Sequence, residues 1–233
     1  MRVYRGRGAT VAADRAASER VVETVAADRD PAVRVWRPSR HVAFGRRDAT
    51  EPGYEAARSA ARDRGFPPVE REVGGRAVAY TGSTVAFARV VPIDDPRSGL
   101  GDRYDAATAD LQEALAALGV DAVEGEPPDA FCPGSHSLQT ADGAHKFVGL
   151  AQRVYSDVAA VAGVLPVADH DAIAGVLAPV YDALGVPFDP VTVGSVARAG
   201  SDPDPDPDRV LEHVESALVG DRPTTVRSVD ATE

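Results

Sequence analysis

The residues of this chain best suited to chemistry are its single cysteine, Cys132, and its single lysine, Lys146. Every other basic residue in the 233-residue chain is an arginine, whose guanidinium keeps its proton, whereas a lysine amine can release one. A thiolate is a strong nucleophile, and a nearby ammonium favours the thiolate and exchanges protons with it. The pair therefore predicts nucleophilic catalysis. The alternative is a chance coincidence in a lysine-poor chain.

The spacing of apolar residues predicts the elements that must position this pair. We expect helices over residues 11–27, 52–65, 103–118, 169–184 and 208–219, the first of them capped by Thr10. We expect strands over residues 32–37, 41–46, 69–73, 76–80, 84–91, 120–123, 135–140, 144–155 and 159–165. Strand pairs mixed with separate helices predict an α+β, or mixed α/β, domain.

Two turns are expected to join strands into hairpins. One is Thr81-Gly82-Ser83, and the other is Asp142-Gly143, which is the stronger turn signal. Counting outward from the second turn, Lys146 lies opposite Gln139, and Cys132 would lie opposite Arg153. Regular pairing therefore does not bring the amine to the thiol, and Pro133-Gly134 must fold the Cys132 loop back.

Composition limits the possible partners and the compartment. A net charge of -11 lacks the basic patch that a nucleic-acid partner requires. One cysteine forms no internal disulfide, and we find no apolar signal-peptide core and no stretch long enough to span a membrane, so we expect a cytoplasmic protein. The histidines show no metal-ligand spacing, and no metal site is expected. Scarce lysine with abundant Asp, Ala, Val and Arg is typical of a salt-adapted, halophilic prokaryote.

Four segments, taken in order, resemble the biotin/lipoate A/B protein ligase superfamily. They are residues 35–48, the R-x-x-GG-x-AV segment at 71–78, Phe-Cys-Pro-Gly-Ser at 131–135 and K-x-x-G-x-A-Q-R at 146–153. The resemblance covers about residues 35–153, and residues 184–196 more loosely. Within the superfamily the chain is most similar to the cysteine-dependent octanoyl-[glycine-cleavage H protein]:protein N-octanoyltransferases, which carry Y/F-C-P-G-S/T followed by K-F-A-G-x-x-Q-R.

The resemblance implies a ligase-like catalytic domain of mixed, largely antiparallel sheets with packing helices. It implies that Cys132 forms an acyl thioester and that Lys146 is the acid/base. The glycine-rich segment would back the acyl chain, Arg71 and Arg76 could hold a carboxylate or phosphate, and backbone N–H groups near Gly74 and Gly75 could stabilise an oxyanion. The expected substrate-binding set is Arg71, Gly74, Gly75, Arg76, Ala77, Val78, Tyr80, Phe147, Val148 and Gly149, in which Val78, Tyr80, Phe147 and Val148 would wall an apolar slot.

The partners implied are the glycine-cleavage H protein and the lipoyl domains of 2-oxoacid dehydrogenase complexes, with no cofactor beyond the acyl group. Two other functions remain open: an ATP-dependent lipoate-protein ligase using ATP and Mg, and a non-catalytic or biotin-related relative. The ligases carry an Asn-Asp pair before the lysine, whereas this chain has Pro128-Asp129-Ala130 there. We expect a catalytic domain over residues 1–198, an acidic Asp-Pro linker over 199–207, and a C-terminal helix and tail over 208–233.

Overall fold

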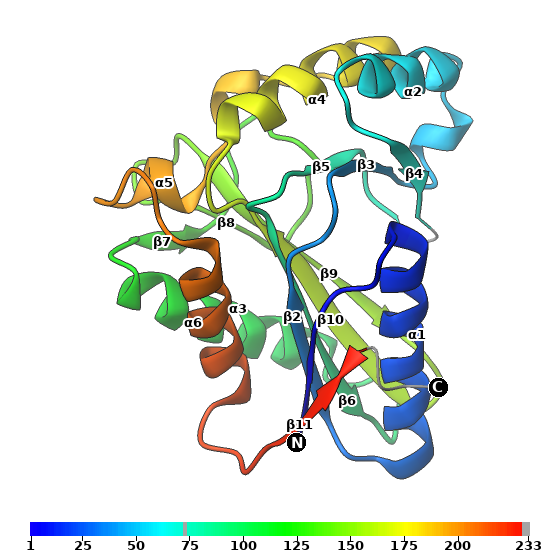
Figure 1. Cartoon of the computed structure of the whole chain (residues 1–233), viewed down its shortest axis with the longest axis vertical. Helices are drawn as coiled ribbons and strands as arrows, with labels where there is room; N and C mark the ends of the chain where they lie inside the picture. The colour runs from blue at the N-terminus through cyan, green and yellow to red at the C-terminus, as the bar shows by residue number, and fades with distance from the viewer. Residues whose placement is uncertain (72–73, 230–233) are drawn as a thin grey trace.

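The chain forms two sheets and the helices that cover them (Figure 1). The structure is a computed structural model, and it describes residues 1–71 and 74–229. In sheet order, the eight-stranded sheet contains β11 (Thr225–Ser228), β1 (Arg2–Arg5), β2 (Ala32–Trp36), β6 (Val85–Pro92), β10 (Val158–Leu165), β9 (Lys146–Val154), β8 (Ser137–Thr140) and β7 (Ala122–Glu124). The three-stranded sheet contains β4 (Pro68–Glu70), β3 (His41–Phe44) and β5 (Val78–Tyr80).

Most strand pairs are antiparallel. The parallel pairs are β1 with β11, β1 with β2, and β3 with β4. The helices are α1 (Val11–Asp28), α2 (Tyr54–Asp63), α3 (Leu100–Ala117), α4 (His170–Leu184), α5 (Val196–Ala199) and α6 (Pro207–Val219). The predicted mixed α/β fold with largely antiparallel sheets is therefore confirmed.

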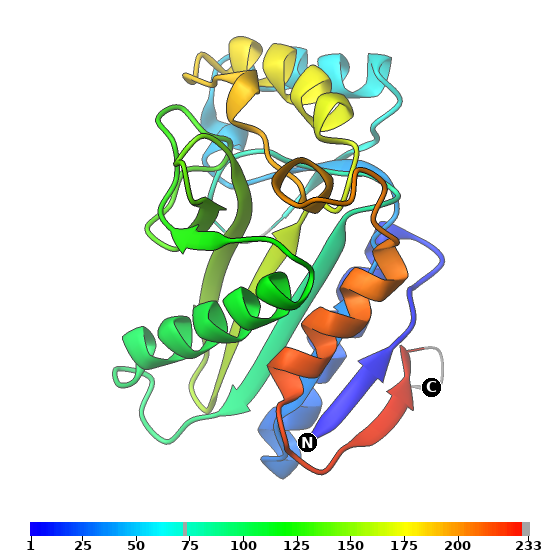
Figure 2. The same cartoon turned by 90° about the vertical axis from the view of Figure 1, so that its left-hand side faces the viewer.

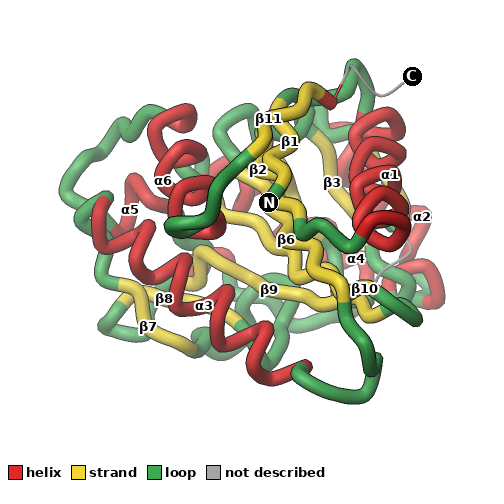
Figure 3. Tube along the Cα trace, turned by 90° about the horizontal axis from the view of Figure 1, so that it is seen from below, coloured by secondary structure: helices red, strands yellow, loops and turns green. Residues whose placement is uncertain are grey.

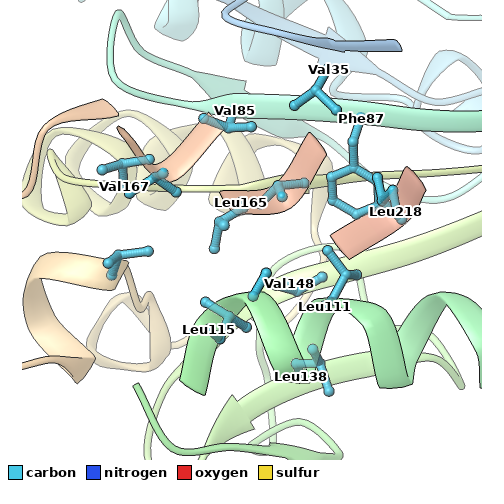
Figure 4. Packing of buried hydrophobic residues seen from close by; sticks show 14 of the residues in the cluster. Val35, Val85, Phe87, Leu111, Leu115, Leu138, Val148, Leu165, Val167 and Leu218 are labelled. Atoms are coloured by element: carbon cyan, nitrogen blue, oxygen red, sulfur yellow. The ribbon is translucent and has the colours of Figure 1, made fainter. Parts of the chain in front are cut away.

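The helices divide the hydrophobic core into three clusters. Helices α3 and α6 cover one face of the eight-stranded sheet, and α1 covers the other (Figures 1 and 3). Figure 4 shows the first cluster, in which Leu111 and Leu115 of α3 pack near Leu138 and Val148 of β8 and β9. Helices α2 and α4 lie side by side over the three-stranded sheet and bury the second cluster (Figure 2).

Local signals explain where several helices begin and end. The Thr10 hydroxyl accepts a hydrogen bond from the Ala13 N–H, and α1 begins directly after this cap, as expected. Helix α4 ends at Gly185, which has the left-handed backbone that glycine adopts without steric cost. Helix α6 follows the Asp-Pro repeat and buries Val210, Val214 and Leu218 in the same cluster as α3.

The sheets differ from the expected strands and turns in three places. The Thr81-Gly82-Ser83 turn does not make a hairpin, because β5 pairs with β3 in one sheet while β6 pairs with β2 and β10 in the other. Two strands were not expected, namely β1 and, in the C-terminal tail, β11. Both missed strands are four residues long, too short for an alternating pattern to stand out. The expected strand 69–73 ends at Glu70 in the sheet, and its last two residues lie outside the described part of the chain.

No helix within residues 1–71 and 74–229 combines the length and apolarity needed to cross a bilayer.

Candidate functional site

Lys146 lies at the first position of β9, next to a shift in strand register that affects the direction of its side chain. The hairpin forms as expected, with Gln139 opposite Lys146, but the pairing then shifts so that Leu138 lies opposite Val148. Phe147 is therefore an extra residue on β9, as in a β-bulge, and bulges redirect neighbouring side chains. The Lys146 side chain is only 1% exposed. Its backbone is also held from the other side, since the Gly194 N–H donates to the Lys146 carbonyl at 2.8 Å.

The loop that carries Cys132 is anchored on both sides of the cysteine. The Phe131 ring is buried in the cluster under α4. The Cys132 N–H donates to the Tyr181 hydroxyl of α4 at 2.6 Å, and that hydroxyl donates to the Ala77 carbonyl at 2.9 Å. Burial, together with the nearby Cys132 sulfur, raises the pKa of Tyr181 well above its ordinary value, so the phenol remains a proton donor. Cys132 has a φ of 43°, which lies in the left-handed region that a non-glycine residue rarely adopts.

This loop brings Cys132 to Lys146, the step that strand pairing alone could not supply. The Lys146 Nζ atom donates to the Cys132 carbonyl oxygen at 2.9 Å. It also lies 5.2 Å from the centre of the Phe131 ring, within reach of a cation–π contact. The amine and the cysteine are therefore neighbours, but the amine contacts the backbone of Cys132 and not its sulfur.

The Cys132 sulfur faces the segment between β4 and β5. It accepts a hydrogen bond from the backbone N–H of Arg76 at 3.3 Å and one from Nη2 of Arg71 at 3.6 Å. The Arg76 guanidinium points elsewhere and pairs with Asp48 at 3.4 Å and Glu51 at 2.7 Å. Two donors thus converge on a thiol that is only partly buried, an arrangement that suits an anionic sulfur.

Two glycines let backbone segments approach each other beside the sulfur. A Cβ atom at Gly45, just after β3, would lie 2.0 Å from the Gly75 carbonyl oxygen. A Cβ atom at Gly75, whose φ is +88°, would lie 2.8 Å from the Cys132 sulfur and 2.9 Å from Arg71 Nη2. The Gly-Gly segment was expected to bring backbone close to something, and in the structure its neighbours are Gly45, Arg71 and Cys132.

Glu126 was not anticipated from the sequence. Its Oε2 atom accepts hydrogen bonds from Lys146 Nζ at 2.7 Å and from Ser137 Oγ at 2.9 Å. Its Oε1 atom accepts one from the Gly134 N–H at 3.0 Å. One carboxylate therefore ties the lysine, strand β8 and the turn after Cys132 together. Its position in an irregular proline-rich stretch gave no periodic signal by which to find it.

The residues expected to bind substrate fall on two sides of the site. Val78 and Tyr80 belong to the cluster under α4, whereas Phe147 and Val148 are fully buried in the cluster under α3 and α6. The structure thus does not bring these four side chains together into one wall. Ala77 is buried, and Gly149 follows Lys146 on β9, where an added Cβ would lie 3.6 Å from Lys146 Cε.

His136, four residues after Cys132, stacks on Tyr104 with 3.6 Å between ring centres. Within the described residues, no three His, Cys, Asp or Glu side chains gather as metal ligands.

Comparison with known proteins places this geometry in a family. Residues 11–215 match the lipoyl protein ligase A/B catalytic domain. The octanoyl-[GcvH]:protein N-octanoyltransferase of Geobacillus kaustophilus is 31% identical over 124 residues, which cover 53% of this chain and 43% of that protein. The protein of the same name from Exiguobacterium sp. is 30% identical over 126 residues, covering 54% and 44%. The matched region is thus less than half the length of these relatives.

Solved structures show the same fold at lower identity. A lipoate-protein ligase A bound with ATP superposes with a TM-score of 0.74 at 19% identity, covering 97% of this chain and 88% of that one. A bipartite lipoate protein ligase from Thermoplasma acidophilum superposes with a TM-score of 0.69 at 17% identity, covering 97% and 85%. The match over residues 11–215 shows that the chain belongs to the lipoyl protein ligase A/B catalytic domain family.

Proposed function

We propose that this protein is an acyltransferase that moves octanoyl or lipoyl groups onto the acceptor lysine of lipoyl domains through a thioester on Cys132. The observation that carries the proposal is the setting of the sulfur. The only thiol of the chain is held in a left-handed backbone, with two N–H donors on the sulfur and an amine at its own carbonyl. A buried structural cysteine requires none of these contacts.

The first half of the reaction forms the acyl-enzyme. The Cys132 thiolate attacks the carbonyl carbon of the octanoyl amide on the donor, and the bond from that carbon to the donor lysine nitrogen breaks. The leaving amine takes a proton from the Lys146 ammonium. Lys146 has one N–H left for this role, because an ammonium has three donors and Glu126 and the Cys132 carbonyl occupy two of them.

The second half reverses these roles. The acceptor lysine amine attacks the thioester carbon, and the bond from that carbon to the Cys132 sulfur breaks. The proton that the attacking nitrogen loses returns to Lys146, and the thiolate is regenerated between Arg71 and the Arg76 N–H. The donor lysine amide and the product amide are alike, so transfer runs close to equilibrium and requires no nucleotide.

The name of the relatives, octanoyl-[GcvH]:protein N-octanoyltransferase, supports the glycine-cleavage H protein as donor, and lipoyl domains are the proposed acceptors. Intact-mass measurement of an apo lipoyl domain tests this directly. The domain is incubated with enzyme and octanoyl H protein without nucleotide, and separately with octanoate, ATP and magnesium. We expect the octanoyl mass on the acceptor in the first mixture. Modification in the second mixture alone would replace the transferase with an ATP-dependent ligase.

The covalent route has its own test. Acid-quenched enzyme should carry an octanoyl adduct that hydroxylamine removes, and Cys132→Ala and Cys132→Ser should carry none. Transfer at the native rate by either variant would rule out the thioester.

A further inference from the structure

Two different cations contact Cys132, and they contact different atoms of it. Nη2 of Arg71 donates to the sulfur, whereas Nζ of Lys146 donates to the carbonyl oxygen. The charge of Lys146 is already paired with Glu126 at 2.7 Å. The cation placed to act on the sulfur is therefore the arginine and not the lysine.

The Arg71 side chain is held in this position by its surroundings. The same Nη2 atom donates to the Arg76 carbonyl at 2.6 Å, which fixes the end of the guanidinium. Its Nε atom is buried and has no hydrogen-bond partner among the described residues. Gly75 makes the approach possible, since a Cβ there would contact both Nη2 and the sulfur at under 3 Å.

The second hydrogen-bond donor to the sulfur is a backbone N–H group, and the side-chain charge of the same residue is paired elsewhere. The backbone N–H of Arg76 points at the sulfur, but the Arg76 guanidinium is paired with Asp48 and Glu51. Arg71 is thus the cation that donates to the sulfur within residues 1–71 and 74–229. An opposite charge and N–H donors both favour an anionic sulfur.

We propose that Arg71 is a catalytic residue that holds Cys132 as the thiolate, and that Gly75 is the position that admits its guanidinium. This role rests on the proposed use of Cys132 as nucleophile. Two basic residues then have two different tasks. The guanidinium of Arg71 keeps its proton and supplies a fixed charge, whereas the amine of Lys146 moves protons.

Other charged or titratable groups surround the thiol and enter any measurement of its ionisation. Tyr181 lies at its backbone N–H, and Asp48 and Tyr80 lie near Arg71. Lys146 and its partner Glu126 lie at the carbonyl side. The test must therefore compare removal of Arg71 with removal of Lys146 in the same protein.

Alkylation by iodoacetamide reports Cys132 alone, because the chain has no other cysteine. The rate is measured against pH for the wild type, Arg71→Gln, Lys146→Gln and the matched control Arg62→Gln, whose arginine is exposed on α2. We expect Arg71→Gln to move the midpoint upward by about one pH unit or more and to slow alkylation near neutral pH by about tenfold. Lys146→Gln should move it less, and Arg62→Gln should overlay the wild type.

The proposal is overturned if Arg71→Gln overlays the wild type, or if Lys146→Gln gives the larger shift. Arg71→Met, with an unbranched side chain, replaces Arg71→Gln should that variant fail to fold, and it carries the same expectation. Alkylation uses no acyl substrate, so its outcome is separate from that of the transfer assay. If the wild type transfers octanoyl but Arg71→Gln has the alkylation profile of the wild type, this role of Arg71 alone is overturned. If Arg71→Gln shifts the alkylation profile but the wild type transfers no octanoyl, the proposed function alone is overturned.

Discussion

The two sheets hold the Cys132 loop by different physical means. On the side of the eight-stranded sheet, a partly buried ion pair of Lys146 with Glu126 fixes the carbonyl of the loop. On the side of the three-stranded sheet, a close approach of glycine backbones places the Arg76 N–H at the sulfur. The eight-stranded side depends on two opposite charges that compensate each other. The three-stranded side depends on glycines, whose lack of a Cβ atom lets the backbones approach. The two sides should therefore fail in different ways.

Lys146→Met breaks the charged side and should have the largest effect. It removes the proposed proton carrier and leaves the Glu126 carboxylate, 21% exposed, without its cation. We expect octanoyl transfer to fall on the order of 100-fold or more. The free energy of unfolding, measured with urea, should fall by about 2 kcal/mol, less than for a fully buried pair.

Lys146→Arg separates charge from proton transfer on this same side. It restores a cation for Glu126 but cannot release a proton at working pH. Stability close to the wild type with transfer still lost is the expected result, and near-native transfer would show that the titratable amine is dispensable.

Gly45→Ala breaks the uncharged side. Its new methyl group would lie 2.0 Å from the Gly75 carbonyl oxygen, and the atoms it meets belong to the backbone of Gly74 and Gly75, so the segment that carries the Arg76 N–H must move. We expect a loss of about 2 kcal/mol in unfolding free energy and a slower alkylation of Cys132.

A methyl group added at Gly175 of α4 provides the matched control, because nothing lies within 4 Å of the Cβ position there. Gly175→Ala should alkylate at the native rate and unfold no more easily than the wild type. If Gly45→Ala behaves in the same way, the close approach does not position the thiol.

Glu126→Gln sharpens the comparison with the smallest expected effect. The amide retains an acceptor for the Gly134 N–H but loses the charge that pairs with Lys146. We expect transfer to fall by about tenfold or less, in line with the loss of a charge-assisted hydrogen bond. Cys132 alkylation should stay close to native, because Glu126 does not contact the sulfur directly in the described hydrogen bonds.

Glu124→Gln, two positions earlier on β7, is the control for this variant, since its side chain is exposed. Equal effects of the two substitutions on transfer would mean that Glu126 acts only through the net charge of the protein.

Sequence signals predicted what is local. The Thr10 cap, the Asp142-Gly143 hairpin and the Gln139–Lys146 pairing each depend on residues a few positions apart, and each was confirmed. The hairpin predicted at Thr81-Gly82-Ser83 was wrong because strand pairing depends on partners from the whole sheet. Strand β6 is buried between β2 and β10, and no short-range signal reports those partners.

Sequence motifs singled out residues that the structure brings together, but they did not predict the contacts among those residues. Motif order pointed to Cys132, Lys146 and the segment around Gly75, yet which cation faces the sulfur depends on a loop in left-handed backbone and on a bulge at Phe147. Glu126 and Tyr181 reach the loop from positions 6 residues before and 49 residues after Cys132, and such tertiary contacts leave no periodic pattern.

The left-handed backbone of Cys132 costs folding free energy at the residue on which the proposed activity depends. A side chain at a φ of 43° costs roughly 1–2 kcal/mol that glycine would not incur, and asparagine tolerates the same conformation better than most residues. If the thiol is the nucleophile, a lineage that no longer needs the transferase gains stability by losing the cysteine. Relatives that keep the fold but have lost the transferase activity would then be expected to carry glycine or asparagine in place of Cys132.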